Sequence, residues 1–296
     1  MKEIVVISGK GGTGKTSISA SFAYLERENS VIADCDVDAA NMHLLLKPQA
    51  IEASDFFSGV KAKIDPALCI NCGVCEEVCR FDAVFFKNAT YSVKQLNCEG
   101  CGYCDKVCPT KAIAMVEQNV GKFFISKSRF GNYLIHARLA IGAENSGKLV
   151  AKVKNEAKKI AKEKGIAFVI VDGAPGIGCP VLSSLTGANY VVLVTEATIA
   201  GFHDLKRVVE LVKKFRLKAG AIINKHDLNK EVTNEIRNFL EKEKIDFISK
   251  IPYNTAFTDA IVNERTIVEF NQNEISDLLK TSWEKIKFNV KEKENL

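Results

Sequence analysis

Short runs of consecutive apolar residues alternate along this chain with longer stretches in which apolar positions recur at helical spacing. Each run is bounded by polar or glycine residues, which is typical of a strand buried on both faces of a parallel sheet. The pattern therefore predicts an α/β fold in which helices cover both faces of a doubly wound, mostly parallel sheet. The expected strands span residues 4–7, 30–33, 121–126, 133–138, 168–172, 191–195 and 219–223. The expected helices span about 17–28, 148–164 and 201–215, with a last one from about 275.

This alternation stops between about residues 59 and 118, where cysteine-rich sequence replaces the apolar runs. Eight of the ten cysteines lie in this segment. A change of composition inside an otherwise regular pattern indicates an inserted domain. We expect a discontinuous α/β domain built from residues 1–58 and 119–296, and a second domain formed by residues 59–118.

A glycine-rich loop follows the first expected strand and leads into the first expected helix. Glycines let the backbone turn its N–H groups around a phosphate, and the helix N-terminus adds partial positive charge. The last lysine of such a loop reaches the terminal phosphates and the next hydroxyl suits magnesium, and these roles fall to Lys15 and Thr16. The sequence therefore predicts binding of a nucleoside triphosphate, taken as ATP, with Mg²⁺. The expected binding residues are Gly9, Lys10, Gly11, Gly12, Thr13, Gly14, Lys15, Thr16 and Ser17.

Carboxylates follow two of the expected strands. Asp34, Asp36 and Asp38 come after the second strand, and Asp172 ends the fifth. Because the carboxyl ends of parallel strands lie beside the nucleotide crevice, these side chains are candidates for the nucleotide site. The alternative is an acidic turn, or a strand ending in an aspartate, that only caps a helix.

The lysine after the first glycine of the loop narrows the class of protein. With Lys10 and Lys15 together, the loop resembles the deviant Walker A loop of the MinD/ParA/Mrp and nitrogenase-iron-protein superfamily of P-loop ATPases. The resemblance implies a homodimer that forms with ATP, in which Lys10 of one subunit reaches the nucleotide of the other. A solvated loop charge is the alternative for Lys10.

The same resemblance assigns the catalytic and magnesium residues. It makes the segment after the second strand switch I, in which Asp36 orients the attacking water and acts in catalysis with Lys10 and Lys15. It makes Asp172 the Walker B residue, which binds Mg²⁺ together with Thr16. The second choices for the water-orienting residue are Asp34, Asp38 and Asn41.

Two residues in the C-terminal part of the chain are assigned to binding the base of the nucleotide. The resemblance implies that Asn224, at the tip of the last expected strand, hydrogen-bonds adenine and that Pro252 lines the base pocket. Asparagine at a strand end is also an ordinary turn former, and this alternative stays open for Asn224.

The inserted segment contains one cysteine pattern twice. The spacing C-x2-C-x2-C-x3-C begins at Cys69 and recurs in full from Cys98. This resembles a bacterial two-cluster ferredoxin, in which the fourth cysteine of each run ligates the other run's 4Fe–4S cluster. Zinc ribbons, the alternative, explain neither the third cysteine nor the repeat. The expected ligands are Cys69, Cys72, Cys75 and Cys108 for one cluster and Cys98, Cys101, Cys104 and Cys79 for the other.

Two features depart from the related families. Cys79 is followed by Arg80 and not by the proline of the ferredoxin pattern; the arginine either raises the potential of one cluster or only faces solvent. Cys179 lies seven residues after Asp172, where nitrogenase-type iron proteins ligate a shared cluster, but residues 142–144 supply no second cysteine. A buried apolar role and a contact to a labile metal or partner are the two interpretations of Cys179.

Composition limits the partners. The chain has 41 basic and 36 acidic residues, and a net charge of +5 is too small to imply nucleic acid. It shows no secretory signal and no apolar run of about 18 residues, and its cysteines suit metal ligation. We therefore expect a cytoplasmic protein without a nucleic-acid partner or membrane contact. Membrane binding by the last helix, as in MinD proteins, is the weaker alternative to packing on the sheet.

These observations suggest three functions. The first is an ATPase that couples dimer and switch changes to electron transfer through two 4Fe–4S clusters, with a redox partner protein. The second is an ATPase for iron–sulfur or metallocofactor assembly, with a partner that receives the metal. The third is a MinD/ParA-like positioning ATPase whose clusters sense redox state.

Overall fold

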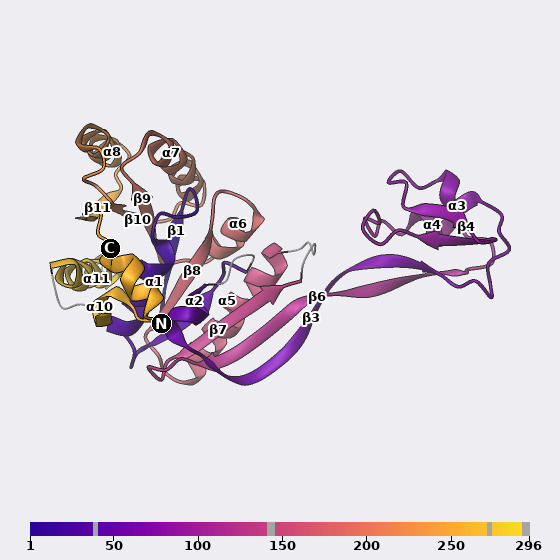
Figure 1. The fold of residues 1–296 in the computed structure, drawn as a ribbon, viewed down its shortest axis with the longest axis horizontal. Helices are drawn as coiled ribbons and strands as arrows, with labels where there is room; N and C mark the ends of the chain where they lie inside the picture. Colours follow the sequence, from indigo (N-terminus) through magenta and orange to yellow (C-terminus); the bar gives the residue numbers. More distant parts are fainter. Residues whose placement is uncertain (38–40, 141–145, 271–273, 292–296) are drawn as a thin grey trace. The chain divides into compact units, whose positions relative to one another are not determined.

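The computed structural model describes residues 1–37, 41–140, 146–270 and 274–291. The chain forms two compact units (Figure 1). Unit 1 comprises Met1–Ser54, Phe123–Arg138 and Ser146–Leu296, and unit 2 comprises Asp55–Lys122 and Leu139–Asn145.

A mostly parallel sheet forms the centre of unit 1. Its strand order is β11-β10-β9-β1-β8-β2-β7-β6-β3, and all neighbours from β11 to β7 pair in parallel. From β1 the chain passes to β2 on one side of the sheet, whereas β9, β10 and β11 follow one another outward on the other side. The sheet is therefore doubly wound, and the predicted α/β, mostly parallel class is confirmed. The strands are β1 (Lys2–Ser8), β2 (Ser30–Asp34), β3 (Gln49–Ile64), β6 (Ile113–Lys127), β7 (Tyr133–Leu139), β8 (Phe168–Pro175), β9 (Tyr190–Glu196), β10 (Ala219–Asn224) and β11 (Asp246–Ile251).

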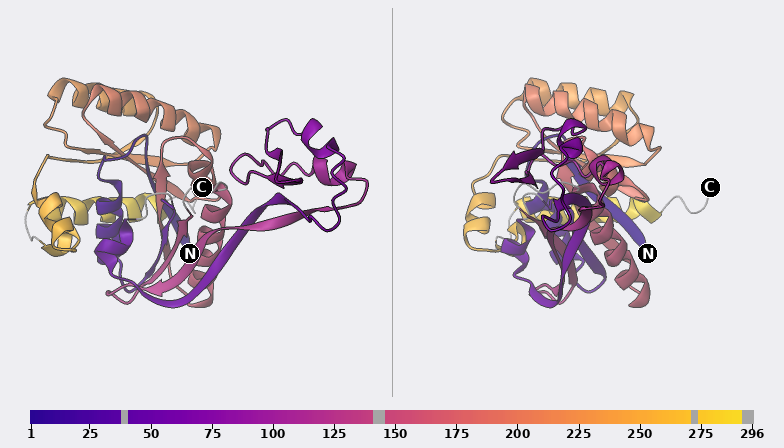
Figure 2. Two further views of the ribbon diagram at one scale, coloured as in Figure 1. Left: turned by 45° about the vertical axis from the view of Figure 1, so that its right-hand side comes forward. Right: turned by 90° about the vertical axis from the view of Figure 1, so that its right-hand side faces the viewer.

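Helices cover both faces of this sheet (Figure 2). On one face, α1 packs with the C-terminal helices in a core that includes Ile4, Val6 and Ile170 of the central strands. On the other face, α7 and α8 lie side by side, with the rings of Phe202 and Phe239 5.6 Å apart. The first set is α1 (Lys15–Leu25), α2 (Met42–Leu46), α9 (Ala256–Val262), α10 (Ile267–Phe270) and α11 (Glu274–Lys291). The second set is α5 (Ser146–Glu163), α6 (Cys179–Leu185), α7 (Ile199–Lys214) and α8 (Lys230–Lys242).

The apolar face of α11 is part of the core. Trp283 is only 1% exposed; its ring stacks on Phe22 at 5.0 Å and meets Phe168 edge-on at 5.8 Å. Its indole Nε1 donates a hydrogen bond to Glu26 Oε2 at 2.7 Å. The side chains that would have entered a membrane are therefore engaged with α1 and the sheet. Within the described ranges, no helix is both long and apolar enough to cross a bilayer.

Unit 2 repeats one small motif. Each short helix, α3 (Val74–Glu77) and α4 (Tyr103–Val107), follows a glycine with positive φ, +81° at Gly73 and +71° at Gly102. Each of these glycines comes directly after the second cysteine of its run, so the structural repeat follows the cysteine repeat. An antiparallel hairpin of β4 (Val84–Lys87) and β5 (Thr90–Val93) separates the helices.

Two strands of this sheet, β11 and β3, were not predicted. In β3, alternation of apolar and polar residues is confined to its last residues, 60–64, and most of the 16 side chains of this strand are at least partly exposed. It is a strand because it pairs with β6, so backbone hydrogen bonds form it and not burial of its side chains. The helix α1 begins at Lys15, two residues before the expected start.

Trp283→Ala should lower the free energy of unfolding by about 3–5 kcal/mol, because it removes a fully buried aromatic side chain and leaves a cavity. Urea denaturation measures this change. Phe288→Ala on the same helix is the control: Phe288 is 57% exposed, and its loss should change stability by no more than about 0.5 kcal/mol. A loss from Trp283→Ala as small as that from Phe288→Ala would show that burial of Trp283 does not stabilise the unit.

Candidate functional site

The glycine-rich loop connects β1 to α1. Gly12 and Gly14 have φ values of +80° and +91°, a conformation that favours glycine. A Cβ on Gly14 would lie 2.5 Å from Nδ2 of Asn224, so glycine is also required for the approach of β10. α1 begins at Lys15 directly after this turn, and its first N–H groups therefore adjoin the loop.

The other loop residues have different surroundings. A Cβ on Gly9 would lie 2.6 Å from Cβ of Asp204 on α7, whereas Gly11 has open space around it. Thr13 is 2% exposed, and its Oγ1 has no hydrogen-bond partner among the described residues. Ser17 lies in the first turn of α1.

Asp172 joins β8 to α1. Its side chain is fully buried, and Oδ1 accepts hydrogen bonds from Lys15 Nζ at 2.8 Å and Ser19 Oγ at 2.9 Å. Oδ2 accepts from Thr16 Oγ1 at 2.8 Å. Burial is the largest single influence and opposes the charge on Lys15. The charge and hydrogen bond of Asp172, together with the charges of Asp36 and Asp34, outweigh burial and raise the pKa of the lysine. The structure thus brings together Thr16 and Asp172, the pair predicted to hold Mg²⁺.

Asp34 and Asp36 lie differently beside this pair. Asp34 is 1% exposed and stands in register with Asp172 on the neighbouring strand. Burial, and then repulsion by Asp172, raise the pKa of Asp34 to about 8. Asp36 is less deeply buried, and its Oδ2 lies 3.7 Å from Lys15 Nζ. Asp36 is therefore the carboxylate that combines proximity to Lys15 with access to solvent, as a water-orienting residue requires.

Lys10 is paired within its own chain. Its Nζ lies 2.6 Å from Oε1 of Glu196, the last residue of β9. Oε2 of Glu196 accepts from Lys225 Nζ at 3.0 Å. The same Lys225 amine donates to the Gly12 carbonyl at 3.0 Å. The tips of β9 and β10 therefore fix both the lysine and the backbone of the loop.

The residues assigned to the base line the same end of the sheet. Asn224 is buried, and its Nδ2 donates to the Thr13 carbonyl at 2.8 Å. Its amide therefore holds the phosphate loop in this structure. Pro252 is half-buried after β11, and the next residue, Tyr253, donates its N–H to Asp227 Oδ1 at 2.6 Å. That bond joins the loop after β10 to the loop after β11.

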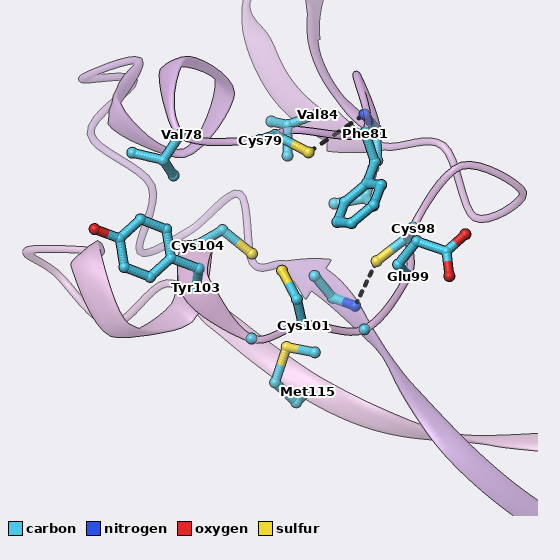
Figure 3. A pocket seen from close by; sticks show the side chains of 15 residues that line it. Val78, Cys79, Phe81, Val84, Cys98, Glu99, Cys101, Tyr103, Cys104 and Met115 are labelled. Atoms are coloured by element: carbon cyan, nitrogen blue, oxygen red, sulfur yellow. Dashed lines mark hydrogen bonds between the residues drawn. The ribbon is translucent and has the colours of Figure 1, made fainter.

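Four cysteines line one cavity in unit 2. Figure 3 shows their sulfur atoms directed into a common space beside Phe81 and Met115. Backbone N–H groups donate to two of these sulfurs, from Ala62 to Cys98 Sγ at 3.5 Å and from Ala83 to Cys79 Sγ at 3.4 Å. The four are Cys79, Cys98, Cys101 and Cys104.

The other four line a second cavity of the same kind. The N–H of Ala112 donates to Cys108 Sγ at 3.3 Å, which matches the bond from Ala83 to Cys79 at the end of the first run. Each cavity takes three cysteines from one run and the fourth from the other, the grouping expected from the spacing. The four are Cys69, Cys72, Cys75 and Cys108.

The cysteines differ in how readily they ionise. At Cys79 and Cys108 burial favours the thiol, but backbone hydrogen bonds outweigh it and lower the pKa. Burial raises the pKa of Cys75 and Cys104. Among the described residues, no three His, Cys, Asp or Glu side chains lie close enough together to hold a single metal ion. A zinc site would need cysteine sulfurs about 2.3 Å from the metal.

The cysteines outside unit 2 have separate positions. Cys35 is fully buried in unit 1, and burial raises the pKa of its thiol. Cys179 is exposed at the start of α6, so its interpretation as a buried apolar residue is wrong: the helix begins there and its first residue does not face the core. Arg80 is exposed, and residues 142–144 lie outside the described residues.

Three residues of the nucleotide site were missed from the sequence. Ser19 is one turn of helix after Lys15, which could have indicated that it faces the same carboxylate. Glu196 ends β9 and Lys225 directly follows β10, but their pairing could be seen only once the strand order was known. Of the second choices for switch I, Asp38 lies outside the described residues and Asn41 is exposed before α2.

A glycine-rich loop between a buried strand and a helix, with an aspartate at a neighbouring strand tip, defines a P-loop nucleotide-binding protein. The family model of the CobQ/CobB/MinD/ParA nucleotide-binding domain (CbiA) matches residues 4–267. This chain belongs to that family.

Similar proteins extend over the whole chain. The uncharacterized protein MJ0578 of Methanocaldococcus jannaschii is 32% identical over 287 residues, 96% of each chain. MJ0579 of the same organism is 28% identical over 280 residues, 92% of this chain and 93% of its own. MinD complexed with Mg-ADP from Pyrococcus horikoshii OT3 has a TM-score of 0.59 at 16% identity, covering 98% of this chain and 97% of that one. The MinC:MinD complex of Aquifex aeolicus gives 0.60 at 16% identity, with 97% and 96% covered. At these identities the solved structures show a shared fold.

Asp34→Asn should flatten the pH dependence of stability between about pH 6 and 8.5. In the folded chain Asp34 holds its proton up to about pH 8, whereas the unfolded chain releases it near pH 4. Protonation of Asp34 therefore stabilises the folded state fully below about pH 4, and this contribution is lost progressively until the pH reaches about 8. Urea unfolding at both pH values should show a loss on the order of 1–3 kcal/mol in the wild type that the variant lacks. The same slope in both proteins would contradict a protonated Asp34.

Proposed function

We propose that this protein is an ATPase of the MinD/ParA type that couples ATP-dependent dimer changes to electron transfer through two 4Fe–4S clusters. The observation that carries the redox part is the gathering of eight cysteines around two cavities, each with three cysteines from one run and one from the other. Electrons would pass to or from a separate redox partner protein.

The donor set of unit 2 suits iron–sulfur clusters. Cubane clusters are held by four cysteine thiolates, and each cavity offers four. Backbone N–H groups already point at Cys79, Cys98 and Cys108, and such bonds stabilise thiolate and tune cluster potential. When bound, the clusters would supply one-electron transfer. The protein would hold them with Cys69, Cys72, Cys75 and Cys108, and with Cys79, Cys98, Cys101 and Cys104.

The nucleotide site suits phosphoryl transfer. Thr13 Oγ1 is a buried hydroxyl without a hydrogen-bond partner among the described residues, so a phosphate oxygen would satisfy it. Lys15 and Lys10 would neutralise phosphate charge, and Asp36 would orient the attacking water. Thr16 and Asp172 would hold Mg²⁺, and Asn224 and Pro252 would contact adenine.

Nucleotide binding would change the contacts of the site. Lys15 is bonded to Asp172, and a bound triphosphate with Mg²⁺ would compete for both groups. Gly176, four residues after Asp172, has φ of +92° and directly follows the end of β8 at Pro175. A shift of Asp172 on nucleotide binding would therefore be passed to the segment that follows β8, where Gly176 allows the backbone to change conformation.

Single Cys→Ser variants test the clusters and their pairing. Anaerobically purified protein should contain about eight iron atoms per chain, and each ligand variant about four. Cys72→Ser and Cys108→Ser should leave the same surviving cluster by electron paramagnetic resonance, because both ligate one cavity. Cys79→Ser and Cys101→Ser should leave the other.

Cys179→Ser is the matched control, and it should keep all of the iron. Loss of a chelator-labile iron in this variant would favour the assembly ATPase, the second candidate, for which the exposure of Cys179 is the supporting observation. A wild-type chain that folds but binds no iron, or binds one zinc ion per run, would contradict the proposal.

ATP should change the rate at which the reduced protein transfers electrons to a low-potential acceptor. Stopped-flow absorbance with and without a nonhydrolysable ATP analogue measures this rate. Lys15→Ala should abolish the nucleotide effect, because it removes the main phosphate contact, while leaving iron content unchanged. Identical wild-type rates with and without nucleotide would contradict the coupling.

A MinD/ParA-like positioning role is a further candidate, and likeness of fold supports it. The chain shares the fold of MinD and of Cyanothece McdA, the latter with a TM-score of 0.59 at 14% identity. Co-sedimentation of the full chain with anionic liposomes or DNA in the presence of ATP would favour this role over electron transfer.

A further inference from the structure

The carboxylate of Glu196 is shared by two lysines. Lys10 approaches Oε1 at 2.6 Å and Lys225 approaches Oε2 at 3.0 Å. The Glu196 side chain is 9% exposed, against 33% for Lys10. Burial disfavours its charge, but the hydrogen bonds from Lys10 and Lys225 outweigh burial and lower its pKa. Glu196 is therefore a buried anion that depends on both cations.

The surrounding backbone fixes the position of this carboxylate. Glu196 ends β9, and α7 begins three residues later at Ile199. Thr198 caps that helix and its Oγ1 donates to Glu196 Oε1 at 3.3 Å. A Cβ on Gly201 would lie 2.6 Å from the Glu196 carbonyl oxygen, so the helix packs tightly against this point. The side chain has little freedom to follow Lys10 elsewhere.

Lys10 and Lys225 differ in what else they hold. Lys225 also donates to the Gly12 carbonyl, so it belongs to the loop framework. For Lys10, the described contacts give Glu196 as its ion-pair partner. Lys10 is thus the member of the group that can leave without opening the loop.

We propose that Glu196 is a positioning residue that holds Lys10 on its own subunit and thereby sets the nucleotide concentration at which the dimer forms. This inference rests on the proposed ATP-dependent dimer, in which Lys10 reaches the partner's nucleotide. Lys10 must then exchange Glu196 for a phosphate of the other subunit. We call the Lys10–Glu196 ion pair the latch. Each dimer must break two such pairs, one in each chain, so the latch opposes dimer formation in both subunits. Lys225 remains on Glu196 and keeps its charge compensated after Lys10 has left.

The test uses the full chain and two measurements. The first is reductive methylation of lysine amines in the nucleotide-free protein, read by peptide mass spectrometry. Glu196→Gln should make Lys10 react faster, because its amine loses its ionic partner. Glu243→Gln is the matched control: it removes a carboxylate paired with Lys213 on the surface, and the reactivity of Lys10 should stay that of the wild type.

The second measurement is sedimentation velocity against a nonhydrolysable ATP analogue with Mg²⁺. Glu196→Gln should reach half-dimer at about tenfold lower analogue concentration, because each chain loses one charge-assisted hydrogen bond and binds one analogue molecule. The double variant Lys10→Ala with Glu196→Gln should behave like Lys10→Ala alone, because the latch acts only through Lys10. Glu196→Asp, which keeps the charge on a shorter side chain, should fall between the wild type and Glu196→Gln in both measurements.

The two measurements test the latch and the proposed ATP-dependent dimer separately. Equal Lys10 reactivity in wild type, Glu196→Asp and Glu196→Gln would overturn the latch, whatever the dimer does. So would a Glu196→Gln protein that needs more analogue to dimerise than the wild type. A wild-type chain that stays monomeric at saturating analogue would contradict the proposed ATP-dependent dimer, even if Lys10 reacts faster in Glu196→Gln.

Discussion

The buried charge of Asp172 is the constraint on which the nucleotide unit depends. A carboxylate in this position costs several kcal/mol unless donors compensate it, and Lys15, Thr16 and Ser19 supply these donors. All three belong to the first turns of α1, so the helix is fixed against β8 by the same bonds that arrange the phosphate-binding groups. Stability and function here share one set of contacts. A nucleotide with magnesium would have to offer equivalent partners to both the lysine and the carboxylate.

Polar side chains at the ends of the neighbouring strands hold other parts of the loop in the same way, by hydrogen bonds and ion pairs. Asn224 and Lys225 hold the carbonyls of Thr13 and Gly12, and Glu196 holds Lys225 and Lys10. The loop itself contains few side chains that could order it, because most of its residues are glycines, which lack a side chain and have a flexible backbone. Its conformation therefore comes from polar side chains on β9 and β10. These contacts order the loop, and Lys10 pairs with Glu196, the bond that we propose is exchanged on dimer formation.

Unit 2 has a different source of order. Its buried apolar side chains are few, chiefly Ala62, Ile64, Val84 and Ile113, and the cysteines pack among them. A core of this size supplies only a few kcal/mol, and natural domains of this length commonly add a metal or disulfides. On the proposed function, the two clusters would be the main cross-links of the unit, and their loss would affect its folding as well as its redox chemistry.

The sequence by itself determined the features that depend on local spacing. The apolar runs predicted the strands of the doubly wound sheet except β3 and β11. The glycines and Lys15 predicted the phosphate loop, and the cysteine repeat predicted the grouping found around the two cavities. Contacts between distant segments needed the tertiary structure. Glu196 and Lys10 lie in opposite halves of the nucleotide unit's sequence, and only the order of β9 and β10 beside β1 brings them together. The pairing of β3 with β6 and the exposure of Cys179 at the start of α6 are likewise features that the local sequence did not indicate. Local pattern records which face of an element is buried, whereas the partner across a sheet is set by topology, which no short stretch of sequence contains.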